Sequence, residues 1–209
     1  MRISEFISDF GYLNIRICFF MIIKKLVVGQ LQTNCYVLID GGVAAVIDPG
    51  DEAQKIAEAV AGSGAVVGYI INTHNHFDHV GGNDELKSKF GAKIMIHGRD
   101  AGGRIFADVP LKEGDILDIG DDRLRVIETP GHTAGSVCLS GADFVISGDT
   151  LFADGFGRTD LPGGSNSDMA MSLEKIDRVI PEGVTVYPGH GDIFKYRKGM
   201  ALAWLDYLG

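Results

Sequence analysis

Short apolar runs recur along the chain in two batches, and each run predicts a strand. Several are continuous and others alternate with polar residues, as expected for buried and half-buried strands. The first batch covers Ile22–Val28, Tyr36–Asp40, Val43–Asp48, Ala65–Ile71 and Lys93–Ile96. The second covers Ile116–Ile119, Arg123–Glu128, Ser136–Leu139, Phe144–Ser147 and Thr185–Tyr187, the first four of which resemble a run of antiparallel strands.

Helical spacing of apolar residues appears beside both batches of strands. It predicts helices over Asp51–Val60, Asp84–Phe90, Asp168–Ile180 and Tyr196–Leu208. Strands in two batches, each with its own helices, indicate one α/β domain with sheets inside and helices outside. The strand pattern begins at Ile22, so we expect residues 1–20 to be an N-terminal extension, upstream of a true start at Met21, and residues 21–209 to form the domain.

Composition and charge narrow the class of protein. The 209 residues carry 28 acidic and 19 basic side chains, a formal charge of −9, which disfavours nucleic acid as a partner. Cys18, Cys35 and Cys138 are too few and odd in number for a disulfide framework, which favours a reduced, cytoplasmic setting. The longest apolar run, Ile15–Ile23, is shorter than the roughly 20 residues of a membrane span, so we expect no membrane association.

Histidines gather where predicted strands end. The segment Thr73–His79 contains His74, His76 and His79 together with Asp78, directly after the apolar run that ends at Ile71. Loops that leave the ends of strands are where α/β proteins place their functional sites. Residues 74, 76 and 78 alternate, so a near-extended backbone would direct them to one side. Imidazole and carboxylate together suit zinc, iron or manganese.

Three more polar residues occupy the same kind of position. His132, Asp149 and His190 each follow a predicted strand and lie beside a Gly turn. Such positions converge when strands lie side by side, so a shared metal site is a far simpler explanation than chance grouping. His97 ends a strand without a Gly turn or a carboxylate beside it, and we interpret it as structural.

Taken in order, these residues resemble the HxHxDH…H…D…H signature of the metallo-β-lactamase superfamily, and every position is filled. The resemblance implies a four-layer αββα sandwich with the metals at the edges of the two sheets. It also implies two divalent metals, zinc first with iron or manganese as alternatives. His74, His76 and His132 would hold one metal, Asp78, His79 and His190 the other, and Asp149 would bridge them. Asp78 and Asp149 are accordingly the predicted catalytic residues.

Within the superfamily the chain resembles the glyoxalase II-like branch, through Val28–Tyr36, Gly148–Phe152 and Gly157–Gly164. This implies a dinuclear hydrolase that cleaves a small-molecule thioester of the S-lactoylglutathione type through a metal-activated hydroxide. Full-length glyoxalase II carries an additional helical C-terminal domain that helps to hold glutathione, whereas 19 residues follow His190 here. The thiol carrier and the acyl group therefore stay open. The alternatives are a mononuclear iron persulfide dioxygenase or a lactonase of the same fold.

Three residues near the signature carry further predictions. Arg158, in a Gly-rich loop, is predicted to bind a substrate carboxylate, and an ion pair with Asp160 is the alternative. For Asp48 we favour a turn-capping role over one in orienting the ligand loops. Tyr187 either lines the pocket or fills the core.

Overall fold

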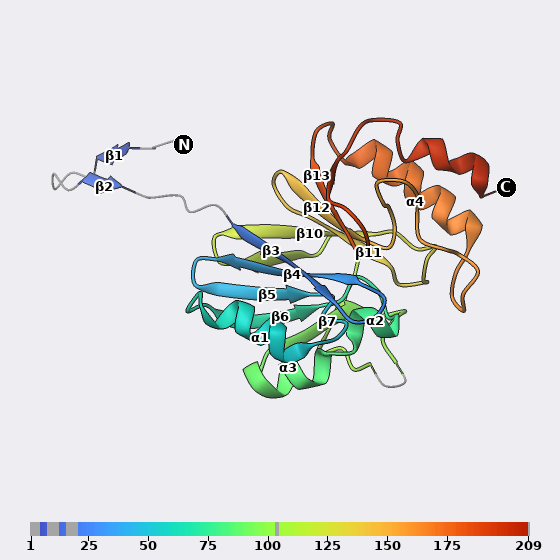
Figure 1. Ribbon diagram of the computed structural model, residues 1–209. Coiled ribbons are helices and arrows are strands. Elements are labelled where there is room, and N and C mark those ends of the chain that lie inside the picture. Colours follow the sequence, from blue (N-terminus) through green and yellow to red (C-terminus); the bar gives the residue numbers. More distant parts are fainter. Residues whose placement is uncertain (1–4, 8–12, 16–20, 103–104, 209) are drawn as a thin grey trace.

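Two six-stranded sheets pack face to face, and helices cover both outer faces (Figure 1). The structure is a computed structural model and describes residues 5–7, 13–15, 21–102 and 105–208. Three hydrophobic clusters correspond to the three interfaces between the four layers. The four-layer αββα sandwich expected from the sequence is confirmed.

The first sheet has the strand order β3-β4-β5-β6-β7-β8. β3, β4 and β5 pair antiparallel, and β5 to β8 run parallel. Parallel strands place their carboxyl ends at one edge of the sheet, where the predicted ligand loops begin. Its strands are β3 (Ile22–Val28), β4 (Thr33–Asp40), β5 (Val43–Ile47), β6 (Val66–Ile71), β7 (Lys93–His97) and β8 (Val109–Leu111).

The second sheet has the strand order β14-β13-β12-β11-β10-β9. Its pairs are antiparallel except β12 with β13, which are parallel. The antiparallel run predicted from the sequence is therefore confirmed. Its strands are β9 (Ile116–Ile119), β10 (Asp122–Glu128), β11 (Val137–Ser140), β12 (Phe144–Gly148), β13 (Thr185–Pro188) and β14 (Phe194–Lys195).

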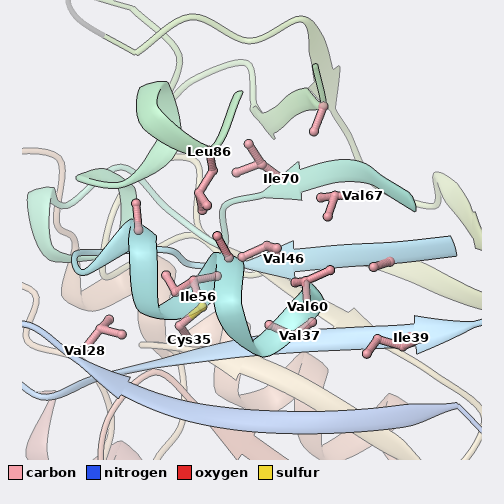
Figure 2. Close-up of a cluster of buried hydrophobic side chains, with 14 of the residues drawn as sticks. Val28, Cys35, Val37, Ile39, Val46, Ile56, Val60, Val67, Ile70 and Leu86 are labelled. Atoms are coloured by element: carbon pink, nitrogen blue, oxygen red, sulfur yellow. The ribbon is translucent and has the colours of Figure 1, made fainter. Parts of the chain in front are cut away.

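The outer helices bury one apolar face each. On the first sheet lie α1 (Ala53–Ala61) and α3 (Asn83–Phe90), and on the second lies α4 (Asn166–Val179). Figure 2 shows Ile56 and Val60 of α1 packed against the sheet residues Val37 and Val46, with Leu86 of α3 near Ile70 in the same cluster. This packing holds rigid the strands whose ends carry the predicted ligands.

The prediction of a closing helix over Tyr196–Leu208 is wrong. The segment begins with a turn, in which Gly199 adopts a φ of +84°, and only Leu202–Tyr207 forms a short 3-10 helix, η1. Tyr196 instead donates its backbone N–H to Val184 O beside β13. A left-handed glycine interrupts an α-helix, so the apolar spacing alone misassigned this segment.

Residues Glu5–Ile7 (β1) and Leu13–Ile15 (β2) pair antiparallel as a separate two-stranded sheet. The first strand of the sandwich begins at Ile22, as the pattern predicts, while the boundary that sets residues 1–20 apart stays a prediction. Cys18 lies outside the described residues. No helix within the described part of the chain is long and apolar enough to cross a membrane.

Candidate metal centre

The seven predicted ligands come from four chain segments that meet at one edge of the sandwich. His74, His76, Asp78 and His79 follow β6, and His132 follows β10. Asp149 directly follows β12, and His190 follows β13. The structure therefore brings together residues spread over more than 100 positions. In the second sheet β10, β12 and β13 run in the same direction, so their carboxyl ends share one edge. The loop after β6 of the first sheet is joined to this edge by the hydrogen bond from Val137 N–H to Thr73 O.

The ligand atoms fall into overlapping groups. His74, His76 and His132 form one group, and Asp78, His79 and His190 form another. A third, His74 with His79 and Asp149, joins the two. Within each group the candidate ligand atoms all lie within 4.8 Å of one another, a spacing that suits a divalent cation.

Asp149 lies between the two main groups. Its Oδ1 is 3.5 Å from His79 Nε2, and its Oδ2 is 3.4 Å from His132 Nε2 and 3.6 Å from His190 Nε2. The carboxylate thus contacts both groups: Oδ2 lies near one histidine of each group, and Oδ1 lies near His79. This placement suits the bridging role that the sequence predicts.

Outward hydrogen bonds orient the imidazole rings. The Nδ1 atom of His132 lies 2.7 Å from Arg158 O, and that of His190 lies 3.1 Å from Leu31 O. The Nδ1 atom of His79 makes an ion-pair contact instead, 3.1 Å from Asp48 Oδ2. When Nδ1 carries the proton for such a bond, the Nε2 lone pair is directed to the interior of the site. The rings are thereby held in the tautomer that binds metal.

Buried atoms without partners indicate that a cation fits these residues. Among the described residues, four buried side-chain atoms have no hydrogen-bond partner. One of them, His79 Nδ1, faces Asp48, and the other three, His74 Nε2, His132 Nε2 and Asp149 Oδ1, are candidate ligand atoms. Burial of an unsatisfied polar atom costs about 1–3 kcal/mol, so three at one place require an explanation. Imidazole nitrogen and carboxylate oxygen are the donors that zinc, iron and manganese accept. The donor set therefore fits divalent metals.

The electrostatics of the site agree with this fit. Burial and the neighbouring histidines lower the pKa of His74 well below its usual range, which leaves a neutral ring with a free lone pair. At His79 burial acts in the same direction, but the carboxylates of Asp149 and Asp48 outweigh it and raise the pKa to about 9. The site thus stabilises positive charge beside His79 and offers lone pairs beside His74.

One detail of the sequence prediction is wrong. Asp78 lies in a short helix, α2 (Phe77–Val80), and His76, its N-cap, is the last extended residue. The alternation of residues 74, 76 and 78 is therefore broken at Asp78, which joins a different group from His74 and His76. α2 packs so closely on the turn after β5 that a Cβ at Gly50 would overlap the backbone of Asp78, so only glycine fits there.

Asp48 has a larger role than the turn cap favoured from the sequence. Its buried carboxylate accepts the backbone N–H and the Oγ1–H of Thr73, each at 2.7 Å, and also faces His79. The residue holds a left-handed φ of +50°, which is uncommon for a non-glycine residue. Asp48 therefore fixes both the start of the ligand loop and the ring of His79.

Asp100 is a supporting residue that the sequence did not reveal. Its buried carboxylate accepts the backbone N–H of Asn75 at 3.1 Å, the backbone N–H of Gly135 at 2.7 Å and the hydroxyl of Thr133 at 2.6 Å. It ties together the loops of His76 and His132. No local signal marks it, because its partners are distant in sequence.

Asn34 is a second supporting residue that sequence reasoning missed. Its side-chain amide donates to Pro188 O at 2.8 Å and Gly191 O at 3.0 Å, on either side of His190. The hydroxyl of Tyr36 also donates to Pro188 O, at 2.7 Å. These bonds from β4 fix the loop that carries His190.

The Arg158 guanidinium makes the ion pair that was the alternative to substrate binding. Its Nε is 2.7 Å from Asp160 Oδ1, and both side chains are exposed. Only the backbone carbonyl of Arg158 contacts the metal centre, through His132. Binding of a substrate carboxylate stays a prediction.

The other candidates lie in the core or form separate pairs. His97 contacts Glu128 Oε1 at 2.9 Å and is in none of the ligand groups found among the described residues. Tyr187 packs edge-on against Tyr36 and Phe144. Cys35 and Cys138 are fully buried, and burial raises the pKa of both thiols.

The chain belongs to the metallo-β-lactamase superfamily, whose family model matches residues 28–190. A probable metallo-hydrolase of Bacillus subtilis, YqgX, is 35% identical over 190 residues, which cover 80% of this chain and 89% of the relative. A hydroxyacylglutathione hydrolase of Rhodospirillum rubrum is 40% identical over 151 residues, or 71% of this chain. The match spans 57% of that relative's length.

Solved structures confirm the fold. The BLEG-1 B3 metallo-β-lactamase superposes with a TM-score of 0.78 at 30% identity, covering 90% of this chain and 99% of that one. ETHE1 from Myxococcus xanthus superposes with a TM-score of 0.77 at 28% identity, covering 84% of this chain and 80% of that one. TTHA1623 in a di-iron-bound form superposes with a TM-score of 0.74 at 31% identity, covering 82% of this chain and 94% of that one. The names of these neighbours span several activities, so the fold alone does not specify the substrate.

Proposed function

We propose that this protein is a dinuclear metal-dependent hydrolase of thioesters of the hydroxyacylglutathione type. One observation carries the proposal: two complete groups of ligand atoms lie beside Asp149, whose carboxylate contacts histidines of both groups. A mononuclear centre built on His74, His76 and His132 has no need of the second group. The similarity to hydroxyacylglutathione hydrolases supports the choice of substrate class.

In the proposed site, His74, His76 and His132 hold one divalent metal, and Asp78, His79 and His190 hold the other. Zinc is the first choice, while the di-iron form of TTHA1623 supports iron as the alternative. When bound, two such metals supply Lewis acidity toward a carbonyl oxygen and toward water.

The side chains of the chain hold this centre ready for reaction. The hydroxyl of Thr33 donates to Asp78 Oδ2 at 2.8 Å, and His190 Nε2 lies 3.3 Å from the same oxygen. Partial burial of Asp78 opposes its ionisation, but these contacts and the charge of His79 outweigh it and hold the carboxyl pKa below its usual range. Asp78 is therefore ionised at neutral pH, as its proposed roles as a metal ligand and a catalytic residue both require.

The leaving group explains why the site suits a thioester. A thiol has a pKa near 8.5, so a thiolate departs without a general acid, unlike an amide nitrogen. Arg158 is proposed to bind a carboxylate of the substrate in place of Asp160, which holds its guanidinium in the free protein.

Metal content measured together with hydrolysis of S-lactoylglutathione tests the proposal. We expect two metals per chain and release of glutathione without uptake of oxygen. A single iron per chain with oxygen consumption on a persulfide would instead establish the dioxygenase alternative. Turnover of lactones with inert thioesters would establish the lactonase.

A further inference from the structure

A small pocket opens beside Asp78. Its volume is about 220 Å³, below the 300–1,000 Å³ of sites that enclose a whole drug-sized ligand. The tip of the β3–β4 hairpin supplies Val28 and Leu31, the turn after β5 supplies Asp51, and the start of α2 supplies Phe77. The pocket therefore has the size for one part of a substrate whose reacting group lies at the metal centre.

Two of the lining side chains are apolar and exposed. Phe77 is 74% exposed and lies between the ligands His76 and Asp78, and Leu31 is 52% exposed. Single exposed apolar residues need no explanation, but these two come from different segments and line one pocket. The backbone carbonyl of Leu31 also contacts the ligand His190, so the hairpin tip is tied to the centre.

The charged lining of the pocket is acidic. Its ionisable residues are Asp51 and Asp78, and no basic side chain is among the described residues that line it. Asp78 faces the predicted metals, whereas Asp51 is exposed and accepts the backbone N–H of Glu52. The two carboxylates repel an anionic group, while Phe77 and Leu31 offer contact to an apolar one. Arg158, by contrast, belongs to the loop that holds His132, in the other ligand group.

We propose that this pocket binds the alkyl part of the acyl group, so that on a given thiol carrier turnover rises with the length of an uncharged acyl chain and falls when the chain is anionic. The inference rests on the proposed thioesterase function and specifies its substrate class. Phe77 and Leu31 provide the apolar contact, and Asp51 provides the discrimination against negative charge.

The test compares acetyl, butyryl, hexanoyl and succinyl thioesters of N-acetylcysteamine, a small uncharged thiol, with the metal-loaded protein. A fully buried methylene is worth about 0.8 kcal/mol, or about fourfold, and about twofold in a half-open pocket. The four additional methylenes of hexanoyl should therefore raise kcat/KM over acetyl by about 16-fold. Phe77→Ala and Leu31→Ala should each reduce this ratio at least threefold.

Matched variants on other surfaces serve as controls. Tyr207 is an aromatic residue that is 72% exposed on η1, and Val66 is an aliphatic residue that is 71% exposed at the start of β6. Tyr207→Ala and Val66→Ala should leave the hexanoyl-to-acetyl ratio unchanged. Asp51→Asn keeps an acceptor for the N–H of Glu52 and should raise succinyl relative to butyryl turnover by about three- to fivefold, the effect of a nearby unit charge in water.

Binding of the acid products provides a readout that needs no turnover. In calorimetric titrations of the metal-loaded protein, hexanoate should bind more tightly than acetate, and Phe77→Ala should remove most of the difference. If every thioester is inert while this binding pattern holds, the thioesterase proposal fails and the pocket assignment stands. Equal binding of both acids, or a chain-length preference that survives both Phe77→Ala and Leu31→Ala, would overturn the pocket assignment.

Discussion

Replacement of Asp48 by Asn tests how the site selects the metal-binding form of His79. In the folded protein, Asp48 Oδ1 accepts the N–H of Thr73 and therefore stays a carbonyl oxygen in the variant. The new amide nitrogen takes the place of Oδ2, which lies 3.1 Å from His79 Nδ1. An amide N–H directed at Nδ1 favours the tautomer that carries its proton on Nε2. That tautomer has no Nε2 lone pair for a metal.

The magnitude follows from the role of such partners. Loss of a hydrogen-bond partner behind a ligating histidine costs about 10- to 100-fold in metal affinity, or roughly 1.4–2.8 kcal/mol. The loss should concern the metal of Asp78, His79 and His190. Asp48 is also one of the carboxylates that raise the pKa of His79 to about 9, so the variant should bind cations more weakly at this group in general.

Competition with a coloured chelator measures both metal affinities. We expect Asp48→Asn to weaken one of two metals, and the same substitution in a His190→Ala background to cost little more, because both changes act on one group. Asp100→Asn is the matched control, since Asp100 supports the loops of His76 and His132 and should weaken the other metal. The reasoning would be refuted if Asp48→Asn bound both metals with the affinity of the unmodified protein, or if the losses of affinity from Asp48→Asn and His190→Ala were additive.

Four further predictions follow from the same structure. His76→Ala should remove metal and activity together, as measured by metal analysis and turnover; full metal content with retained turnover would show that the site is misassigned. Arg158→Ala should raise KM for S-lactoylglutathione at nearly constant kcat, and an unchanged KM would exclude its substrate role. Leu86→Ala, in the core under α3, should lower the free energy of unfolding by about 2–5 kcal/mol in denaturant titrations, and a loss below 1 kcal/mol would contradict its burial. Partial burial of Glu128 opposes its ionisation, but hydrogen bonds from His97 and the Glu113 N–H outweigh burial and lower the carboxyl pKa. The ionised carboxylate should therefore stabilise the fold above the unfolded-state pKa of about 4.3, and this contribution should be lost as the pH falls. The Tm gap to Glu128→Gln should accordingly be widest near neutral pH and close below about pH 4, whereas a gap independent of pH would rule out an ionic origin.

The local pattern of the sequence predicted most of the fold. Runs such as Val43–Ile47 and Phe144–Gly148 are buried on both faces, and burial of that kind selects continuous apolar residues that any reader of the sequence can find. The segment after Tyr196 shows the limit. Its apolar spacing suits a helix, but Gly199 and the pairing of Tyr196 with Val184 override that preference.

The sequence by itself also determined which side chains are available as ligands, because chemistry that needs imidazole and carboxylate can be supplied only by those residue types. Only the tertiary structure decided their grouping: α2 turns Asp78 away from the group of His74 and His76, and the strand order places Asp149 between the groups. It likewise decided the supporting contacts of Asp48, Asp100 and Asn34. Such contacts join residues tens to more than a hundred positions apart, so no pattern in the sequence near them could reveal them.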